Sequence, residues 1–185
     1  MMCKLSGENM KFRYLLLAIG LLTLVMACKQ GEQDTRVGLT PAIGERMQMA
    51  PFKKDSLTDK TIIDSRQLDG QMLLVTFFAS WCPPCIQEIP ALITLQDSFK
   101  SKGFSVIAFS VDEGDLAPLQ KLINKFGINY PVLLADPVVT RSFGGVTGIP
   151  ATFLVNRQGQ IVKKYLGYVG HDFLEEDIKS MLSEG

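Results

Sequence analysis

The sequence predicts an α/β domain in which a central mixed β-sheet is covered by helices on both faces and is preceded by a β-hairpin. The first observation is the order of the segments, because strands alternate with helices before a hairpin and a closing helix. The second is size: of 185 residues, 46% are hydrophobic, which is enough for one domain with its own core. The third is that the chain has four cysteines, too few for a disulfide framework, so the core must hold the fold together.

The hairpin is expected at the beginning of this domain. Residues 47–57 mix apolar and polar side chains, and 61–64 form a short strand-like segment. We expect these two segments to pair, and the turn signal at 68–70 then leads into the central strand.

The central strand and the helix after it have the clearest patterns. Residues 72–79 form an apolar run that is typical of a strand buried on both faces. The following helix is expected at 86–100, with its start around 82–84, where proline suits a first helical turn. Its apolar face has helical spacing and consists of Ile89, Leu92, Ile93, Leu95 and Phe99.

The second half of the domain is expected to add the rest of the sheet and three more helices. In chain order the expected elements are a strand at 104–111, a helix at 116–126, a strand or extended link at 130–134, a short helix at 138–143, strands at 151–155 and 160–165, and a helix at 171–182. The two late strands flank 156–159, a hairpin turn. The closing helix is expected to turn Phe173, Leu174, Ile178 and Leu182 inward.

The N-terminus has the pattern of a secretory signal. Lys11 and Arg13 precede an uncharged run, 14–28, which is too short to span a bilayer comfortably. The run ends in Leu-Val-Met-Ala-Cys, which resembles the bacterial lipobox and implies that Cys28 carries the lipid. The alternatives are an uncleaved signal anchor and a soluble secreted form.

These features divide the chain into three parts. Residues 1–28 are the expected lipoprotein signal peptide, although Met10 begins a more ordinary signal than Met1 does. Residues 29–46 are polar and lack apolar periodicity, so they are expected to form a flexible tether. Residues 47–185 are the expected domain. A lipid on Cys28 would anchor this domain in the cell envelope, on the periplasmic or extracytoplasmic side.

The central strand ends in Trp81-Cys82-Pro-Pro-Cys85, and this motif is the expected site. Two cysteines separated by two residues at a helix start can close into a disulfide, and the helix end favours thiolate over thiol. Such a pair could also be half of a zinc site. Cys82 at the exposed edge is the expected nucleophile, and Cys85 is the expected resolving thiol.

The surroundings of this motif resemble the thioredoxin superfamily. The Phe-Ala-Ser-Trp before the cysteines, the two prolines between them and the later segment 147–155 all match its landmarks. Glu88, three residues after Cys85, makes the chain most similar to the TlpA/ResA branch of membrane-tethered thioredoxins. The resemblance implies a thioredoxin fold and thiol–disulfide oxidoreductase activity.

The resemblance also implies roles for individual residues. Glu88 would be a partly buried acid that tunes the cysteines and accepts a proton, whereas a solvated surface charge is the alternative. The buried aspartate of thioredoxins proper is replaced here by Thr76. Pro150 would be the cis-proline beside the dithiol. The expected substrate contacts are Trp81, Pro83, Pro84, Ile149 and Pro150.

The expected function is reduction of disulfides in secreted proteins or in apocytochrome c, with a membrane thiol donor of the CcdA/DsbD type as the source of electrons. We expect no cofactor and no bound metal, and a net charge of zero gives no reason to expect nucleic acid as a partner. One alternative is an oxidant of the same fold. A peroxidase is disfavoured because Ala79 stands where a threonine is usual. A copper-handling module is disfavoured because the chain has one histidine, His171.

Overall fold

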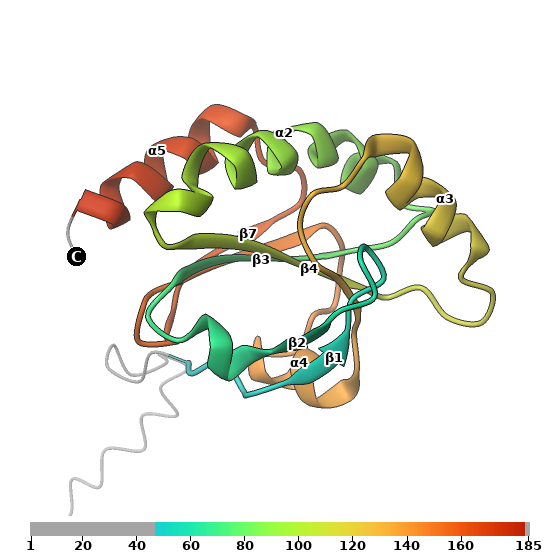
Figure 1. Ribbon diagram of the computed structural model, residues 1–185, viewed down its shortest axis with the longest axis horizontal. Helices are drawn as coiled ribbons and strands as arrows, with labels where there is room; N and C mark the ends of the chain where they lie inside the picture. The colour runs from blue at the N-terminus through green and yellow to red at the C-terminus, as the bar shows by residue number, and fades with distance from the viewer. Residues whose placement is uncertain (1–46, 184–185) are drawn as a thin grey trace, which may run out of the picture. The chain divides into compact units, whose positions relative to one another are not determined.

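A five-stranded mixed sheet forms the centre of the computed structural model, which describes residues 47–183 (Figure 1). The strands are β1 (Lys53–Asp55), β2 (Ile62–Asp64), β3 (Met72–Phe78), β4 (Phe104–Ser110), β5 (Val132–Leu134), β6 (Ala151–Val155) and β7 (Ile161–Leu166). The α-helices are α2 (Pro83–Phe99), α3 (Ala117–Phe126), α4 (Pro137–Ser142) and α5 (His171–Ser183). Short 3₁₀ helices at Ser65–Leu68 and Lys100–Lys102 lead into β3 and β4.

Strand β3 lies in the middle of the sheet, whose order is β5-β4-β3-β6-β7. It pairs in parallel with β4, and Phe78 lies opposite Ser110. It pairs in antiparallel with β6, and Phe77 lies opposite Ala151. These two pairings confirm the predicted mixed sheet. They also bring the end of β4 and the start of β6 to the edge of the sheet at which β3 ends.

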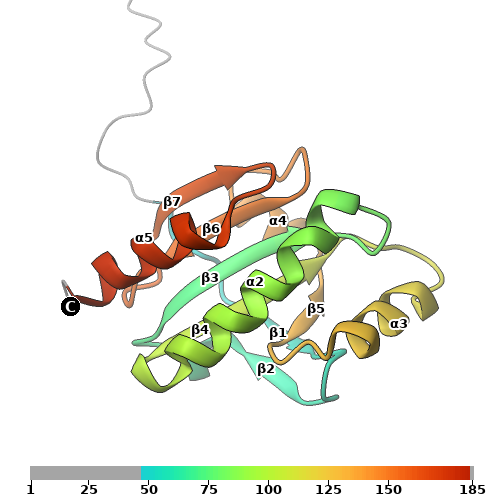
Figure 2. The ribbon, with the colours of Figure 1, turned by 90° about the horizontal axis from the view of Figure 1, so that it is seen from above.

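Both faces of the sheet are covered, as predicted. Figure 1 shows α2, α3 and α5 on one face and α4 with the β1–β2 hairpin on the other, and Figure 2 shows α2 running between α5 and α3. Side chains of β3 alternate between the two cores, so that Leu74 and Phe78 lie beneath α2 while Val75 and Phe77 face α4 and the hairpin. This alternation explains why the strand is apolar along most of its length.

The N-terminal hairpin is also as predicted, with β1 and β2 paired in antiparallel. Lys54 on β1 bonds to the Asp136 carboxylate at 2.6 Å, and Asp136 caps α4 by accepting hydrogen bonds from the N–H groups of Val138 and Val139. The hairpin is therefore tied to the helix that covers the same face of the sheet.

The predicted β6–β7 turn owes its shape to two residues. Asn156 accepts hydrogen bonds at its side-chain oxygen from the N–H groups of Gln158 (3.1 Å) and Gln160 (2.9 Å). Gly159 has φ 76°, a conformation that glycine adopts without a steric penalty.

The closing helix α5 differs from the prediction at one position. Leu174 and Ile178 are buried against the sheet, but Phe173 is 72% exposed. Neighbouring side chains on a helix point about 100° apart, and at this position the step from Leu174 to Phe173 leads from the buried side of α5 to solvent. The inward orientation predicted for Phe173 is wrong.

Among residues 47–183, no helix is long and apolar enough to cross a membrane. The predicted signal peptide at 1–28, its lipidated Cys28 and the tether at 29–46 lie outside the described residues.

Candidate active site

The two cysteines of the motif lie at the start of α2, shortly after the end of β3. Cys82 is the N-cap residue of α2, with extended φ and ψ of −98° and 101°, and Pro83 is the first helical residue. Cys82 and Cys85 form a disulfide with an S–S distance of 2.04 Å and a Cα–Cα distance of 5.3 Å. The motif therefore forms the small redox-active ring that its spacing predicts.

Cys82 is more buried than predicted. It exposes 4% of its surface, although it was expected at an exposed edge, and Cys85 exposes 2%. Both pack in the apolar core beneath α2. The helix-starting position of Cys82 is thus as predicted, but a substrate must reach a sulfur that is nearly covered.

The two prolines reduce the number of N–H donors at the start of α2, next to Cys82. Pro83 is exposed and Pro84 partly buried, and both occupy the first turn of α2. A helix N-terminus normally offers free N–H groups that stabilise an anion. Proline has no N–H, so α2 has two fewer donors for a Cys82 thiolate than an ordinary helix start.

Glu88 is a buried carboxyl group. It is 2% exposed on the face of α2 that packs on the sheet, and its Oε1 accepts a hydrogen bond of 2.7 Å from the N–H of Val169. Burial raises the pKa of Glu88 from its ordinary 4.5 to about 7, although the Val169 hydrogen bond lowers it. A solvated surface charge, the alternative considered for this residue, is excluded.

The negative charge of Glu88 acts on a buried tyrosine, Tyr130. Burial raises the pKa of Tyr130 above its ordinary value, and the negative charge of Glu88 raises it further. On the i, i+3 spacing, the Cβ atoms of Cys85 and Glu88 are separated by roughly 5–6 Å. Cys85 and Glu88 are therefore neighbours along one side of α2.

Thr76 lies in the sheet beneath α2, at the position where thioredoxins proper carry a buried aspartate. It is buried, and its hydroxyl accepts a hydrogen bond of 3.1 Å from the Thr152 hydroxyl of the neighbouring strand. This pair is polar but carries no charge. Among residues 47–183, Glu88 is thus the residue that places a buried carboxyl group in the core beneath α2.

Pro150 lies next to the dithiol through the sheet. The Ile149–Pro150 peptide bond is cis, as predicted. Because Ala151 pairs with Phe77, the residue before it lies beside the end of β3, from which the chain continues to Cys82. The Pro150 carbonyl accepts a hydrogen bond of 2.9 Å from the N–H of Gly167, so this loop is also tied to the segment that carries Val169.

The predicted substrate contacts flank the two motifs in the sequence. Trp81 is 66% exposed, immediately before the first cysteine, and Ile149 is partly buried in front of the cis bond. Together with exposed Pro83 they give the site apolar, uncharged surroundings. Apolar exposed side chains of this kind are typical of surfaces that bind other polypeptides.

Sequence reasoning missed two contacts of the site. Asp112 accepts hydrogen bonds from both the N–H and the hydroxyl of Ser80, and it was not singled out from the sequence. Val169, the donor to Glu88, was not singled out either. The position of Asp112 just after a buried strand is a signal that could have indicated it, whereas nothing in the local sequence indicates Val169.

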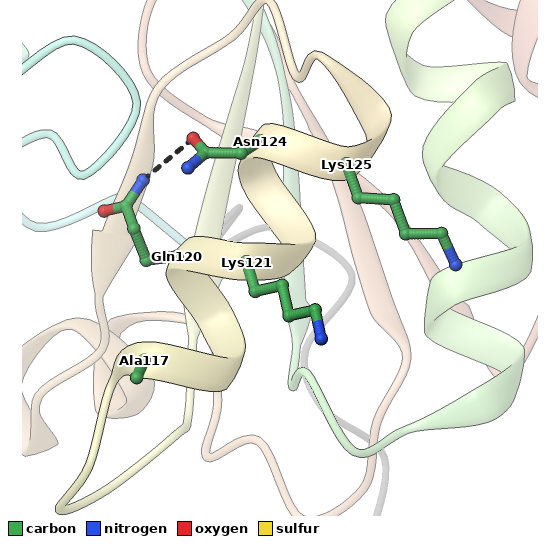
Figure 3. Close-up of a pocket in the computed structure, with 5 residues that line it drawn as sticks. All are labelled: Ala117, Gln120, Lys121, Asn124 and Lys125. Atoms are coloured by element: carbon green, nitrogen blue, oxygen red, sulfur yellow. Dashed lines mark hydrogen bonds between the residues drawn. The ribbon is translucent and has the colours of Figure 1, made fainter.

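Two other features lie apart from this chemistry. His171 begins α5 and its Nδ1 lies 3.1 Å from the Asp172 carboxylate, and residues 47–183 contain no cluster of three or more side chains arranged to hold a metal ion. An open hollow of about 640 Å³ is lined by residues of α3, namely Ala117, Gln120, Lys121, Asn124 and Lys125, whose side chains Figure 3 shows. It contains no residue of the dithiol motif.

A dithiol at a helix start, beside a cis-proline and a buried carboxyl group on a thioredoxin-type sheet, defines the class of thiol–disulfide oxidoreductases. The model of the Redoxin family matches residues 43–182. The chain belongs to the Redoxin family.

Relatives of known function agree with this class. The chain is 29% identical over 114 residues to the thiol-disulfide oxidoreductase ResA of Halalkalibacterium halodurans, a match that covers 62% of this chain and 64% of that protein. It is 27% identical over 168 residues to ResA of Bacillus subtilis, covering 90% of this chain and 92% of that protein. The predicted resemblance to the ResA branch is confirmed.

A solved structure agrees as well. The crystal structure of a thiol:disulfide interchange protein of the thioredoxin family from Chlorobium tepidum is similar with a TM-score of 0.69 and 31% identity, covering 76% of this chain and 99% of that one. This likeness confirms the predicted thioredoxin fold.

Proposed function

We propose that this protein is an extracytoplasmic thiol–disulfide oxidoreductase that reduces disulfides of secreted proteins, including the oxidised cysteine pair of apocytochrome c. The observation that carries the proposal is the Cys82–Cys85 disulfide at the start of α2, next to the cis Ile149–Pro150 bond and above buried Glu88. Its similarity to ResA supports the same class of reaction.

The reaction follows from the arrangement of the two sulfurs. In the reduced protein, the Cys82 thiolate attacks one sulfur of a substrate disulfide, and the other substrate sulfur leaves as a thiol. Cys85 then attacks the Cys82 sulfur of this mixed disulfide, the second substrate thiol is released, and the Cys82–Cys85 bond forms. Two electrons pass from the dithiol to the substrate.

Glu88 is the proposed proton acceptor for the second step. Cys85 must lose its proton to attack, and Glu88 follows it on the same helix with a pKa of about 7. A carboxyl group with a pKa near the working pH is both a usable acceptor and a usable donor. The same group can therefore return the proton when the disulfide is opened again.

The electrostatic surroundings of Cys82 and Cys85 favour their disulfide over their thiolate form, so that the reduced dithiol tends to donate electrons to a substrate. A stabilised thiolate makes a dithiol a strong oxidant, because it favours the reduced form. Here Pro83 and Pro84 remove two N–H donors from the helix start, and an ionised Glu88 adds a buried negative charge. Both features disfavour the thiolate and so favour the disulfide, which is the property of a reductant.

The supply of electrons and the location are part of the proposal. A lipid on Cys28 would hold the domain at the membrane, through the tether at 29–46, on the extracytoplasmic side. A membrane thiol donor of the CcdA/DsbD type would then reduce Cys82–Cys85 after each turnover. Mass spectrometry of the mature N-terminus tests the anchor, and an unmodified Cys28 would contradict it.

The deciding experiment is the reduction potential of Cys82–Cys85, measured by equilibration against glutathione or thioredoxin. We expect a value near or below about −250 mV, on a scale where thioredoxin lies at about −270 mV. A value near about −120 mV, like that of DsbA, would mean that the protein introduces disulfides, and the reductase proposal would fall. Peroxide consumption and Cu(I) titration, both expected to be negative, test the peroxidase and copper alternatives.

A further inference from the structure

The loop in front of Cys82 is held by a carboxylate from another strand. Asp112 lies just beyond β4, and its carboxylate accepts hydrogen bonds from the Ser80 N–H (2.9 Å) and the Ser80 hydroxyl (2.6 Å). The Ser110 hydroxyl donates to the same carboxylate at 2.6 Å, and the Asp112 N–H donates to the Ser110 hydroxyl at 3.0 Å. Ser80 is therefore fixed to the end of β4 through both its backbone and its side chain.

Core packing and three backbone hydrogen bonds also restrain this part of the loop. Ala79 and Cys82 are buried in the core beneath α2. The Phe78 carbonyl accepts a hydrogen bond from the Val111 N–H, the Cys82 N–H donates to Ala79 at 3.2 Å, and the Ile86 N–H donates to the Cys82 carbonyl at 3.1 Å. The side chain of Cys82 does not cap α2. Hydrogen bonds to a carboxylate are roughly twice as strong as those between neutral groups, so the Asp112–Ser80 pair is the strongest restraint on the approach to Cys82 among the hydrogen bonds named here.

We propose that Asp112 is a positioning residue for the dithiol, which holds Cys82 in place relative to Cys85 while their disulfide is open. The inference rests on the proposed function. In the oxidised protein the disulfide ring itself limits where Cys82 can move. In the reduced protein the ring is gone, and the Asp112–Ser80 contact adds to core packing in keeping the loop in the geometry that lets the ring close.

The direction of the effect follows from this difference between the two states. Loss of the contact gives the reduced loop more conformational freedom and leaves the closed ring constrained, which shifts the equilibrium toward the reduced form. The Asp112 charge acts in the same direction. Ser80 and Cys82 are two residues apart, at most about 7 Å between Cα atoms, so the carboxylate disfavours a Cys82 thiolate and its removal relieves that repulsion.

The test is the equilibrium of the full-length protein with glutathione. In this exchange two glutathione thiols give up two electrons and two protons, the Cys82–Cys85 bond opens to two thiols, and one glutathione disulfide forms. The reduced fraction at each glutathione ratio is read by alkylation and mass spectrometry. We expect Asp112→Ala to lower the equilibrium constant for disulfide formation at least threefold, and Ser80→Ala to lower it by a smaller factor.

The matched control is Asp115→Asn, which removes a carboxylate from the same loop. Asp115 accepts a hydrogen bond of 2.9 Å from the Ala117 N–H at the start of α3, away from the Ser80 peptide. We expect its equilibrium constant to stay within about a factor of 1.5 of the wild type. If Asp112→Ala does not fold, Ser80→Ala takes its place, because it removes the hydroxyl donor to Asp112 and leaves the carboxylate charge unchanged.

The outcomes separate the two proposals. If the wild type exchanges with glutathione but Asp112→Ala, or Ser80→Ala in its place, matches it, or if Asp115→Asn shifts the equilibrium equally, Asp112 has no positioning role and this inference alone is overturned. If the wild-type disulfide does not exchange with glutathione at all, the proposed function fails, and this inference fails with it.

Discussion

Glu88 should make the stability of this protein depend on pH in a way that a single substitution removes. Its pKa is about 7 in the folded protein and ordinarily 4.5. Below about pH 4.5 the carboxyl group is protonated in both the folded and the unfolded chain, so it adds no pH dependence. Between about pH 4.5 and about pH 7, the unfolded chain has already released this proton while the folded chain still holds it. The free energy of unfolding therefore falls as pH rises through this range.

The size of this decrease in the free energy of unfolding follows from the two pKa values of Glu88. The difference of about 2.5 pKa units between 4.5 and 7 corresponds to about 3 kcal/mol, because one unit equals 1.36 kcal/mol. The full cost is present above about pH 7 and absent at pH 4. In Glu88→Gln the side chain does not ionise, while its amide oxygen can still accept the hydrogen bond from Val169.

The assay is urea unfolding of the oxidised protein between pH 4 and pH 8.5. We expect the stability of Glu88→Gln relative to the wild type to rise by about 3 kcal/mol from pH 4 to pH 8. Any effect of the new amide on packing adds a constant offset, so only the slope is diagnostic. Glu176→Gln, on the exposed side of α5, is the control and should stay within about 0.5 kcal/mol of the wild type throughout. A difference between Glu88→Gln and the wild type that does not change with pH would refute the assignment of a buried, proton-binding Glu88.

Three further predictions follow from the site and the core. Cys85→Ser should accumulate a mixed disulfide through Cys82 that is visible by mass spectrometry, and the Cys82→Ser/Cys85→Ser double variant should not; trapping by neither would contradict the assigned order of attack. Trp81→Ala should slow reduction of protein disulfides several-fold while leaving the glutathione equilibrium and the stability, within about 0.5 kcal/mol, unchanged; equal loss toward both substrates would argue against a docking role. Thr76→Val should lower the free energy of unfolding by about 1–3 kcal/mol, because it leaves the Thr152 hydroxyl unpaired. Adding Thr152→Val should recover much of this loss in denaturant unfolding. A further loss in the double variant would show that the pair is not an isolated contact.

The fold could be predicted because its main elements are encoded by local patterns. The apolar run at 72–79 and the apolar spacing within α2 each indicate one element without knowledge of the rest. The burial of Glu88 was expected only from the resemblance to the TlpA/ResA branch, and the structure shows it buried beside Ile89 on α2. The protein partner of Glu88 could not be predicted, since Val169 lies 81 positions further along the chain.

The remaining differences have the same origin. Cys82 was expected to be exposed because it begins a helix, but its exposure depends on how α2 settles on the sheet and on the segments that surround it. Asp112 contacts a residue 32 positions away, and its role depends on β3 and β4 ending at the same edge. Local sequence determines which residues end a strand, whereas the parallel pairing of two strands determines which of these ends meet.

The cost of ionising the buried Glu88 carboxyl group bears on the function of this residue. Its neighbours on α2 are apolar, and a neutral side chain at this place would avoid the cost of ionisation at neutral pH. The structure instead places an ionisable group one helical turn after Cys85, with a pKa close to the pH at which thiol exchange proceeds. A group that costs stability where it is buried and has the right pKa for proton transfer fits a catalytic role better than a structural one. The proposed roles of Glu88 and Asp112 agree in one respect, because a carboxylate near a sulfur disfavours its thiolate and so favours the disulfide that the proposed reductase leaves behind.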